Sequence, residues 1–233
     1  MQNEVLEYKY DLHVHSMETS SCGHMYISEV LDYYYREGYS GLAVTDHFSD
    51  EHFRLIGEHE KSWEDRITRF LLGYRTAIKR AAELNMDVIL GIELRFPESS
   101  RDYLVFGIDE EFLYRNPYCY ESSPSEFFTR FGDEVIILQA HPFRVNRATG
   151  AYNDFVPTFM HGVEFNTNPR KNNYNDRVIA VCREHPEFIC INGSDVHQPV
   201  DLCSSYTSFK QRIRDSVELK DALISREYVL GFT

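Results

Sequence analysis

Residues 11–16 read Asp-Leu-His-Val-His-Ser and close the first strand-like run of this sequence, Leu6–Val14. Side chains two residues apart on a strand point to the same face. Asp11, His13 and His15 therefore share one face, and the apolar residues between them point toward a core. Two neighbouring imidazoles on one face form half of a metal site, because imidazole nitrogen is a common ligand of zinc.

Further strand-like runs follow, and longer helix-like segments separate several of them. The runs are Gly41–Thr45, Asp87–Glu93, Tyr103–Gly107, Glu134–Gln139, Gly162–Phe165 and Phe188–Asn192. The helix-like segments are Ser28–Arg36, Ser62–Leu84, Asn173–Glu184 and Val217–Arg226, with a short strand expected at Tyr228–Phe232. Strands that alternate with helices predict an α/β fold with a mostly parallel sheet, either an irregular barrel or a doubly wound sheet.

Metal-binding residue types recur where these runs end. They are Asp46 and His47, Glu93, His141, Glu164 and Asn166, and Asp195 and His197. In both candidate folds the carboxyl ends of parallel strands carry the functional groups at one edge. We therefore expect these side chains to meet His13 and His15 in a site that holds more than one metal ion.

The other histidines fit this pattern less well. His52 and His59 lie in a charged loop and are predicted to be solvated, whereas His161 and His185 are predicted to be structural. His24 is left open between the two roles.

The composition bounds the kind of protein. The chain has 233 residues, 42% of them hydrophobic, and a formal net charge of −13. No apolar run approaches the roughly 18 residues of a membrane span, so no membrane partner is expected. The acidic charge argues against a long nucleic acid as partner. No linker or repeat marks a boundary, which favours one domain over residues 1–233.

The cysteines favour a reducing compartment. There are five, Cys22, Cys119, Cys182, Cys190 and Cys203, and no two of them have CxxC spacing. This number and spacing predict free thiols rather than a disulfide framework or a zinc ribbon. With no leader pattern in the first residues, the expected location is cytoplasmic.

Six ordered segments resemble the PHP (polymerase and histidinol phosphatase) family of metal-dependent phosphoesterases. They are DLHVHS at 11–16, TDH at 45–47, GIE at 91–93, AHPFR at 140–144, VEFNTNPR at 163–170 and GSDVH at 193–197. The resemblance implies a single-domain, distorted (β/α)7 TIM-like barrel. It also implies two or three divalent metal ions (Zn, Mn or Fe) at the C-terminal rim.

Carried over residue by residue, the resemblance assigns three overlapping sets of ligands. One metal would be held by His13, His15, Glu93 and Asp195. A second would share Glu93 and add His141. A third would use His47 and His197 with a residue from the loop after His15.

Two positions depart from the family pattern. In the loop after His15, Cys22 falls on the usual ligand position, and a thiolate there would favour zinc. The alternatives are His24 as the ligand, or no third metal. The fourth strand lacks the histidine that several relatives supply to the second metal, and Asp102 or water would take its place.

The resemblance further implies hydrolysis of phosphate esters by a metal-bound hydroxide, since metal binding lowers the pKa of water toward about 7. Asp46 is expected to orient an imidazole from behind the ligands. Arg144 and Arg170 follow strand ends and are expected to bind substrate phosphate through paired donors. The expected substrate is a small phosphomonoester of the sugar, nucleotide or histidinol phosphate type.

Other functions stay open at this point. The family also contains exonucleases, so a phosphodiesterase that acts on short oligonucleotides is one alternative. A non-catalytic metal-binding PHP module is another, since a fold does not fix a function. A metal amidohydrolase on a similar barrel is disfavoured, because no strand here ends in the lysine that such enzymes carbamylate. The oligomeric state is not indicated.

Overall fold

The structure is a computed structural model that describes residues 8–97, 99–145, 150, 153–171 and 173–232. Its strands are β1 (Tyr8–Val14), β2 (Gly41–Val44), β3 (His47–Phe48), β4 (Asp87–Leu90), β5 (Ile92–Arg95), β6 (Asp102–Phe106), β7 (Ile136–Gln139), β8 (Gly162–Asn166), β9 (Ile189–Gly193), β10 (Ser205–Phe209) and β11 (Tyr228–Phe232). The start of the first predicted strand, Leu6 and Glu7, lies outside the described residues.

The α-helices are α1 (Ile27–Arg36), α2 (Asp50–Leu55), α3 (Trp63–Phe70), α4 (Leu72–Leu84), α5 (Glu110–Arg115), α6 (Pro124–Phe131), α7 (Asn175–Glu184) and α8 (Ser216–Ser225). Short 3-10 turns lie at Cys119–Glu121 and Pro199–Asp201. The single helix predicted over Ser62–Leu84 is two helices, because the chain leaves helical geometry at Leu71.

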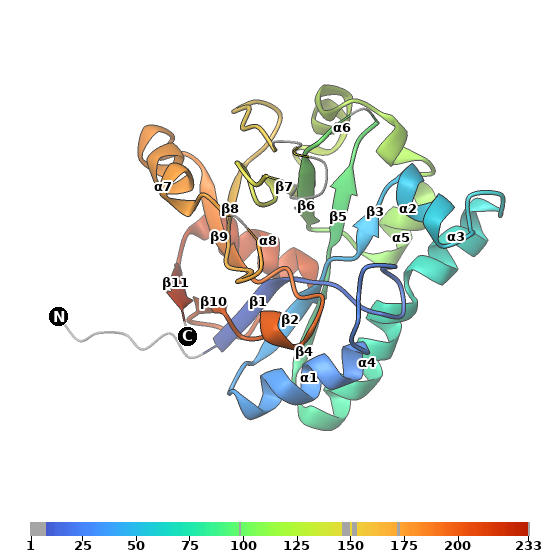
Figure 1. Cartoon of the computed structure of the whole chain (residues 1–233), viewed down its shortest axis with the longest axis horizontal. Coiled ribbons are helices and arrows are strands. Elements are labelled where there is room, and N and C mark those ends of the chain that lie inside the picture. Colours follow the sequence, from blue (N-terminus) through green and yellow to red (C-terminus); the bar gives the residue numbers. More distant parts are fainter. Residues whose placement is uncertain (1–7, 98, 146–149, 151–152, 172, 233) are drawn as a thin grey trace.

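The strands form two sheets (Figure 1). One is five-stranded in the order β11-β10-β1-β2-β4, and the other is six-stranded in the order β3-β5-β6-β7-β8-β9. The α/β class is therefore as predicted, but no closed sheet is present among the described strands. Strand pairing does not continue from β4 to β5, which Gly91 separates. It also stops after β9, where a single bridge, Val14 to Val196, joins β1 to the segment that follows β9.

The prediction of a mostly parallel sheet holds only in part. The parallel pairs of the five-stranded sheet are β1 with β2 and β2 with β4. Those of the six-stranded sheet are β3 with β5, β7 with β8, and β8 with β9. β6 runs antiparallel to both β5 and β7. Only residues 96–101 connect β5 to β6, and a parallel crossover needs about a dozen residues or more. As a result, β6 begins where its parallel neighbours end.

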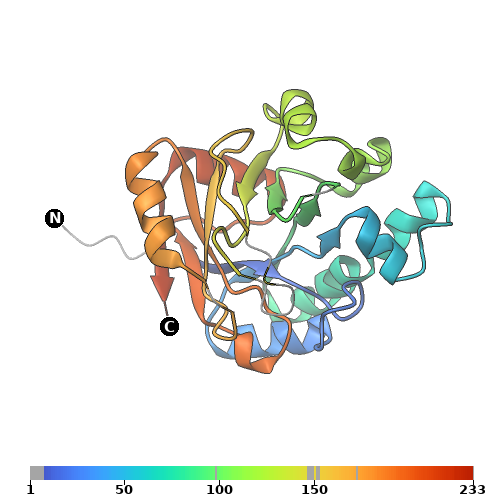
Figure 2. The same ribbon diagram turned by 45° about the horizontal axis from the view of Figure 1, so that its top comes forward.

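The two sheets enclose a common core. Leu12 of β1 belongs to the same buried cluster as Leu104 of β6 and Leu138 of β7, which lie in the other sheet. Leu219 and Leu223 of α8 complete this cluster. Helices α1 and α4 lie side by side along the five-stranded sheet, and α7 lies beside β8 (Figures 1 and 2).

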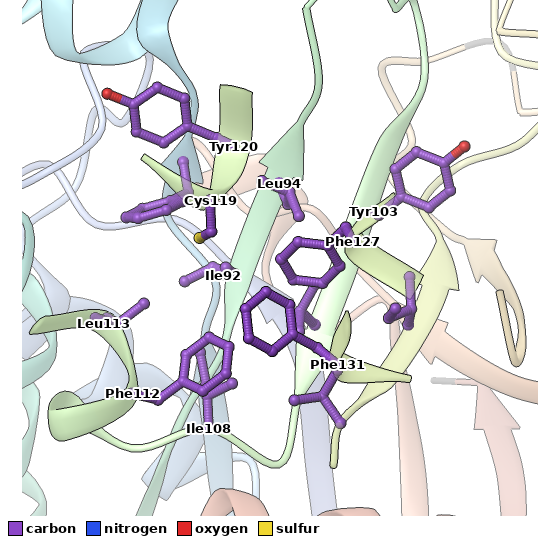
Figure 3. Packing of buried hydrophobic residues seen from close by; sticks show 14 of the residues in the cluster. Ile92, Leu94, Tyr103, Ile108, Phe112, Leu113, Cys119, Tyr120, Phe127 and Phe131 are labelled. Atoms are coloured by element: carbon purple, nitrogen blue, oxygen red, sulfur yellow. The ribbon is translucent and has the colours of Figure 1, made fainter. Parts of the chain in front are cut away.

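An aromatic cluster covers the outer face of the six-stranded sheet (Figure 3). Phe112 of α5 and Phe131 of α6 pack with Ile92 and Leu94 of β5. Since neighbouring side chains on a strand alternate between faces, this packing turns Glu93 to the opposite face. The apolar flanks of Glu93 thus fix the direction of the carboxylate.

One prediction about the cysteines is wrong. Cys182 of α7 and Cys190 of β9 are joined as a disulfide, whereas Cys22, Cys119 and Cys203 are free thiols. The pairing joins a helix to the strand that follows it, a contact that sequence spacing does not reveal. Within the described part of the chain, no helix is both long enough and apolar enough to cross a membrane.

Candidate metal centre

The predicted ligands from the strand ends converge at one edge of the two sheets. His13 and His15 are almost fully buried side by side on β1, and their Nε2 atoms lie 3.1 Å apart. Leu12 and Val14 point away into separate apolar clusters. The alternation of the opening stretch therefore places two imidazoles in the site, as the sequence predicts.

Glu93 lies at the centre of the group, with four imidazoles around its carboxylate. Its Oε1 is 2.9 Å from His141 Nε2 and 3.6 Å from His13 Nε2. Its Oε2 is 2.6 Å from His47 Nδ1 and 3.3 Å from His15 Nε2. A carboxylate in this position is suited to bridge two cations, the role that the family resemblance implies.

Asp195 closes the other side of the group. Its Oδ1 lies 3.2 Å from His15 Nε2, 3.5 Å from His13 Nε2 and 3.4 Å from His197 Nδ1. Asp195 has a φ of 55°, and His141 a φ of 32°, in the left-handed region that residues other than glycine seldom adopt. Backbone strain of this kind clusters at functional sites.

Three sets of donor atoms have the spacing of metal ligands. They are His15, Cys22, His47 and His197; His13, His15 and Glu93; and Glu93, Asp102 and His141. Within each set the atoms lie within 4.8 Å of one another. The sets share His15 and Glu93, so they form one continuous centre.

The structure distinguishes the two candidates in the loop after β1. Cys22 joins His47 and His197, whereas the His24 side chain is exposed and belongs to none of the three sets. Burial raises the pKa of the Cys22 thiol, but hydrogen bonds from His197 and His47 outweigh it and lower this pKa to about 5. A thiolate is the form of cysteine that binds metals.

Asp102 also reaches the centre, because β6 runs antiparallel and starts at this edge. Its Oδ2 lies 3.7 Å from His141 Nε2. Arg95 holds the same carboxylate, since Arg95 Nε donates to Oδ1 at 2.6 Å and Nη2 donates to Oδ2 at 2.8 Å. Asp102 therefore belongs to the ligand set of Glu93 and His141, with its charge offset by Arg95.

The hydrogen bonds behind the histidines fit a bound metal. Glu164 Oε1 lies 2.7 Å from His13 Nδ1, and the backbone oxygen of Asp195 lies 2.8 Å from His197 Nδ1. Both oxygens only accept, so each Nδ1 carries a hydrogen, and Nε2 is the nitrogen that would bind a metal once its own proton is displaced. This arrangement of an acceptor behind a ligating histidine is usual in metal sites.

A buried oxygen without a hydrogen bond supports the same conclusion. Glu93 is 1% exposed, and its Oε2 makes no hydrogen bond of good geometry in the described residues, although His47 Nδ1 forms an ion pair with it at 2.6 Å. A buried carboxylate is costly unless positive charge compensates it, and a bound metal ion would do so in place of a protonated imidazole. The donor set of imidazoles, carboxylates and a thiolate therefore fits divalent metal ions.

The charges of the centre are strongly coupled. Burial raises the pKa of Glu93 and Asp195, but His47 beside the first and Arg144 beside the second hold both values well below their usual range. Burial lowers the pKa of His15, yet its contacts with Asp195 and Glu93 raise it to about 9. Metal binding at neutral pH must therefore displace protons from imidazoles.

Asp46 acts on His15 through a serine. Its Oδ1 accepts hydrogen bonds from the Ser16 backbone nitrogen at 2.8 Å and from Ser20 Oγ at 2.6 Å. Ser20 Oγ in turn lies 3.4 Å from His15 Nδ1. Asp46 therefore reaches the imidazole indirectly, and its own carboxylate lies 4.0 Å from His15 Nδ1.

The two arginines predicted to bind phosphate are held by carboxylates. Arg144 Nη1 donates to Asp195 Oδ2 at 2.7 Å, and Arg170 Nε donates to Asp201 Oδ1 at 2.6 Å. Asp201 also accepts from the backbone nitrogen of His197 at 3.1 Å, so Arg170 supports the segment that carries this histidine. Arg144 Nη2 is buried and has no partner within the described ranges.

The sequence predicts Glu164 at the centre but not its contacts, and it does not predict the burial of His52. Glu164 lies within β8, accepts from the His141 backbone nitrogen at 2.7 Å and contacts His13. His52, predicted to be solvated, is 3% exposed, and its ring centre lies 6.3 Å from that of His47. The apolar neighbour Phe53 in the same helix was the available signal for its burial.

Comparison with known proteins identifies the family. The PHP domain model matches residues 11–228, nearly the whole chain, so the chain belongs to the PHP domain family. No curated protein matches the sequence.

Solved structures share the fold at low sequence identity. A two-domain protein from Bacteroides vulgatus, described as containing a predicted PHP-like metal-dependent phosphoesterase, has a TM-score of 0.67 and 18% identity over 97% of this chain. The chain spans 64% of that protein's length. A putative metal-dependent phosphoesterase from Bifidobacterium adolescentis has a TM-score of 0.52 and 13% identity, over 92% of this chain and 95% of its own.

Proposed function

We propose that this PHP domain hydrolyses phosphate esters with the help of divalent metal ions, and that its substrate is a small phosphomonoester. The observation that carries the proposal is the continuous centre of three ligand sets that share His15 and Glu93. Metal ions bound there would supply Lewis acidity, which lowers the pKa of water and offsets charge on phosphoryl oxygens. The strained backbone at His141 and Asp195 favours a working site over a vestigial one.

The residues around the metal ligands would position those ligands and the substrate. Glu164 and the backbone oxygen of Asp195 hold His13 and His197 with their Nε2 atoms toward the centre. We propose that Arg144 binds substrate phosphate, which is supported by its buried Nη2 without a hydrogen-bond partner in the part described. Arg170 stays a proposed phosphate ligand, and its pairing with Asp201 gives it a positioning role as well.

The net charge of −13 supports a small substrate over a long polynucleotide. Short oligonucleotides are the second candidate class, and a phosphodiester substrate separates them from phosphomonoesters. A single domain and a cytoplasmic location remain predictions.

The proposal is tested with carboxylate-to-amide variants of Glu93, the expected bridging ligand, and of Asp195, an expected ligand of one metal. Glu93→Gln and Asp195→Asn are expected to lower hydrolysis of p-nitrophenyl phosphate at least about 100-fold, because even partners behind a ligand are worth about 10–100-fold. Circular dichroism should show an intact fold. The exposed positions give matched controls, Glu64→Gln and Asp221→Asn, which should keep wild-type rates. Full activity of either centre variant would refute the shared-metal site.

A further inference from the structure

The two ends of the centre offer different ligand chemistry. One end is the set of three imidazoles and a thiol, from His15, His47, His197 and Cys22; the set itself includes no carboxylate, although Glu93 Oε2 and Asp195 Oδ1 border it. The other end consists of Glu93, Asp102 and His141, in which oxygen ligands predominate. Soft thiolate and imidazole ligands select zinc, whereas carboxylate oxygen suits harder ions such as Mn²⁺ and Mg²⁺.

The position of Cys22 is built into the fold. In its loop, the Gly23 backbone nitrogen donates to Ser20 oxygen at 3.0 Å, and the His24 backbone nitrogen donates to His197 oxygen at 2.7 Å. A Cβ on Gly23 would lie 2.8 Å from the Ser16 oxygen, so the turn can pack this closely only with glycine there. These contacts hold the thiol against the histidine end.

Buried metal-ligand atoms converge at this end. Glu93 Oε2 lies 2.6 Å from His47 Nδ1 and 3.3 Å from His15 Nε2, and no hydrogen bond of good geometry in the described chain occupies it. His15 is 1% exposed. A cation among these atoms would satisfy the carboxylate and both imidazoles together.

The carboxylate end is expected to bind a metal ion less tightly, because Asp102 is already hydrogen-bonded to Arg95. Both oxygens of Asp102 already accept hydrogen bonds from Arg95, at 2.6 and 2.8 Å. The guanidinium offsets the charge of Asp102 and competes with a metal for its lone pairs. This end therefore has fewer ligands, and one of them is partly neutralised.

We infer that the centre sorts its metals: the Cys22 end retains zinc, while the Glu93–Asp102–His141 end takes a harder divalent ion that exchanges readily. This inference rests on the proposed metal centre and specifies which ions it uses. It also assigns opposite effects to the two departures from the family pattern, since Cys22 softens one end and Asp102 hardens the other.

The test measures metals on the full chain, without substrate. After treatment with a weak chelator and addition of Mn²⁺, elemental analysis of the wild type should show about one zinc retained per chain and manganese that is lost again on dialysis. With Co²⁺ in place of zinc, the wild type should show a sulfur-to-cobalt charge-transfer band. Cys22→Ser should lose this band and the retained zinc, whereas Cys119→Ser, which changes a buried thiol outside the three ligand sets, should keep both.

Two further variants keep the test decisive. Asp102→Asn should lose the exchangeable manganese and keep the cobalt band. Cys22→Asp, which supplies an oxygen ligand if Cys22→Ser does not fold, should bind Co²⁺ without the sulfur-to-cobalt band. A cobalt band that persists in Cys22→Ser, or zinc that leaves the wild type as readily as manganese, would overturn the inference. A chain that sorts metals in this way but releases no phosphate would reject the proposed function alone.

Discussion

At the scale of single residues, the centre depends on acceptors that lie behind the ligands. Glu164 accepts from His13 Nδ1 at its Oε1 and from the His141 backbone nitrogen at its Oε2, both at 2.7 Å, and Asn166 Nδ2 also donates to Oε1 at 3.2 Å. It therefore orients ligands from two different parts of the centre without belonging to any ligand set. Such a carboxylate both fixes the imidazole tautomer and raises the basicity of the ligand.

Glu164→Gln is expected to lower metal affinity by about 10–100-fold while the fold remains intact. Donors reach both oxygens of Glu164, whereas the amide keeps an acceptor at only one of the two positions, and its NH2 group faces a donor at the other. Competition with a chromogenic chelator measures the affinity, and Glu187→Gln, an exposed position, is the matched control. An unchanged affinity in Glu164→Gln would exclude this role.

His52 predicts a specific acid sensitivity. Burial, followed by the charges of His47 and His15, lowers the pKa of His52 to about 3. Between this value and the unfolded value of about 6.5 only the unfolded chain binds the proton, so stability is full above pH ~6.5 and falls as the pH drops. From pH 6.5 to 5 this contribution is about 2 kcal/mol.

His52→Phe should remove that contribution, because the phenyl ring keeps the packing and has no group to protonate. Urea unfolding of both proteins at the two pH values, in the presence of chelator, isolates the effect from metal loss. If the free energy of unfolding falls by the same amount in both proteins between the two pH values, the inference that His52 is buried in its neutral form is wrong.

At the scale of elements, close packing between strands fixes the positions of side chains in the centre. A Cβ on Gly193 of β9 would lie 2.0 Å from Glu164 Oε1 and 2.6 Å from the Cβ of His13. Gly193→Ala is therefore expected to destabilise the chain by about 1–3 kcal/mol and to lower its metal content, because Glu164 must leave His13.

Gly57→Ala is the control that separates the effect of backbone strain from the effect of displacing Glu164. Gly57 has a φ of 76° and no neighbour within 4 Å of an added Cβ, so this change costs stability through backbone strain alone. Its metal content should equal that of the wild type. Thermal unfolding and elemental analysis of both variants make the comparison, and equal metal loss in the two would contradict the proposed path through Glu164.

Several elements of the site follow directly from sequence, and others do not. The alternation around His13 and His15 places both imidazoles, because it depends only on the period of a strand. Asp102 required the direction of β6, which the short connection of residues 96–101 would have indicated. The contacts that Glu164 makes with His13 and His141, and the approach of His52 to His47, depend on which side chains meet across elements, and the local sequence does not specify those partners.

At the scale of the whole molecule, the described strands form two sheets that share a buried core, and no closed sheet is found among them. The ligands of the centre come from strand ends of both sheets. His13 lies in the five-stranded sheet and Glu93 in the six-stranded one, and their facing atoms are 3.6 Å apart. The relative placement of the sheets therefore assembles the ligand sets.

The most direct test of metal-dependent phosphoester hydrolysis is phosphate release from phosphomonoesters by the full chain, after chelation and after metal return. The chelated protein is expected to release no phosphate from p-nitrophenyl phosphate or a panel of sugar and nucleotide monophosphates. Addition of Zn²⁺ with Mn²⁺ should restore release in the wild type and not in Glu93→Gln. Release that is unaffected by chelation, or its absence on every phosphomonoester with every divalent metal tried, would contradict the proposed function.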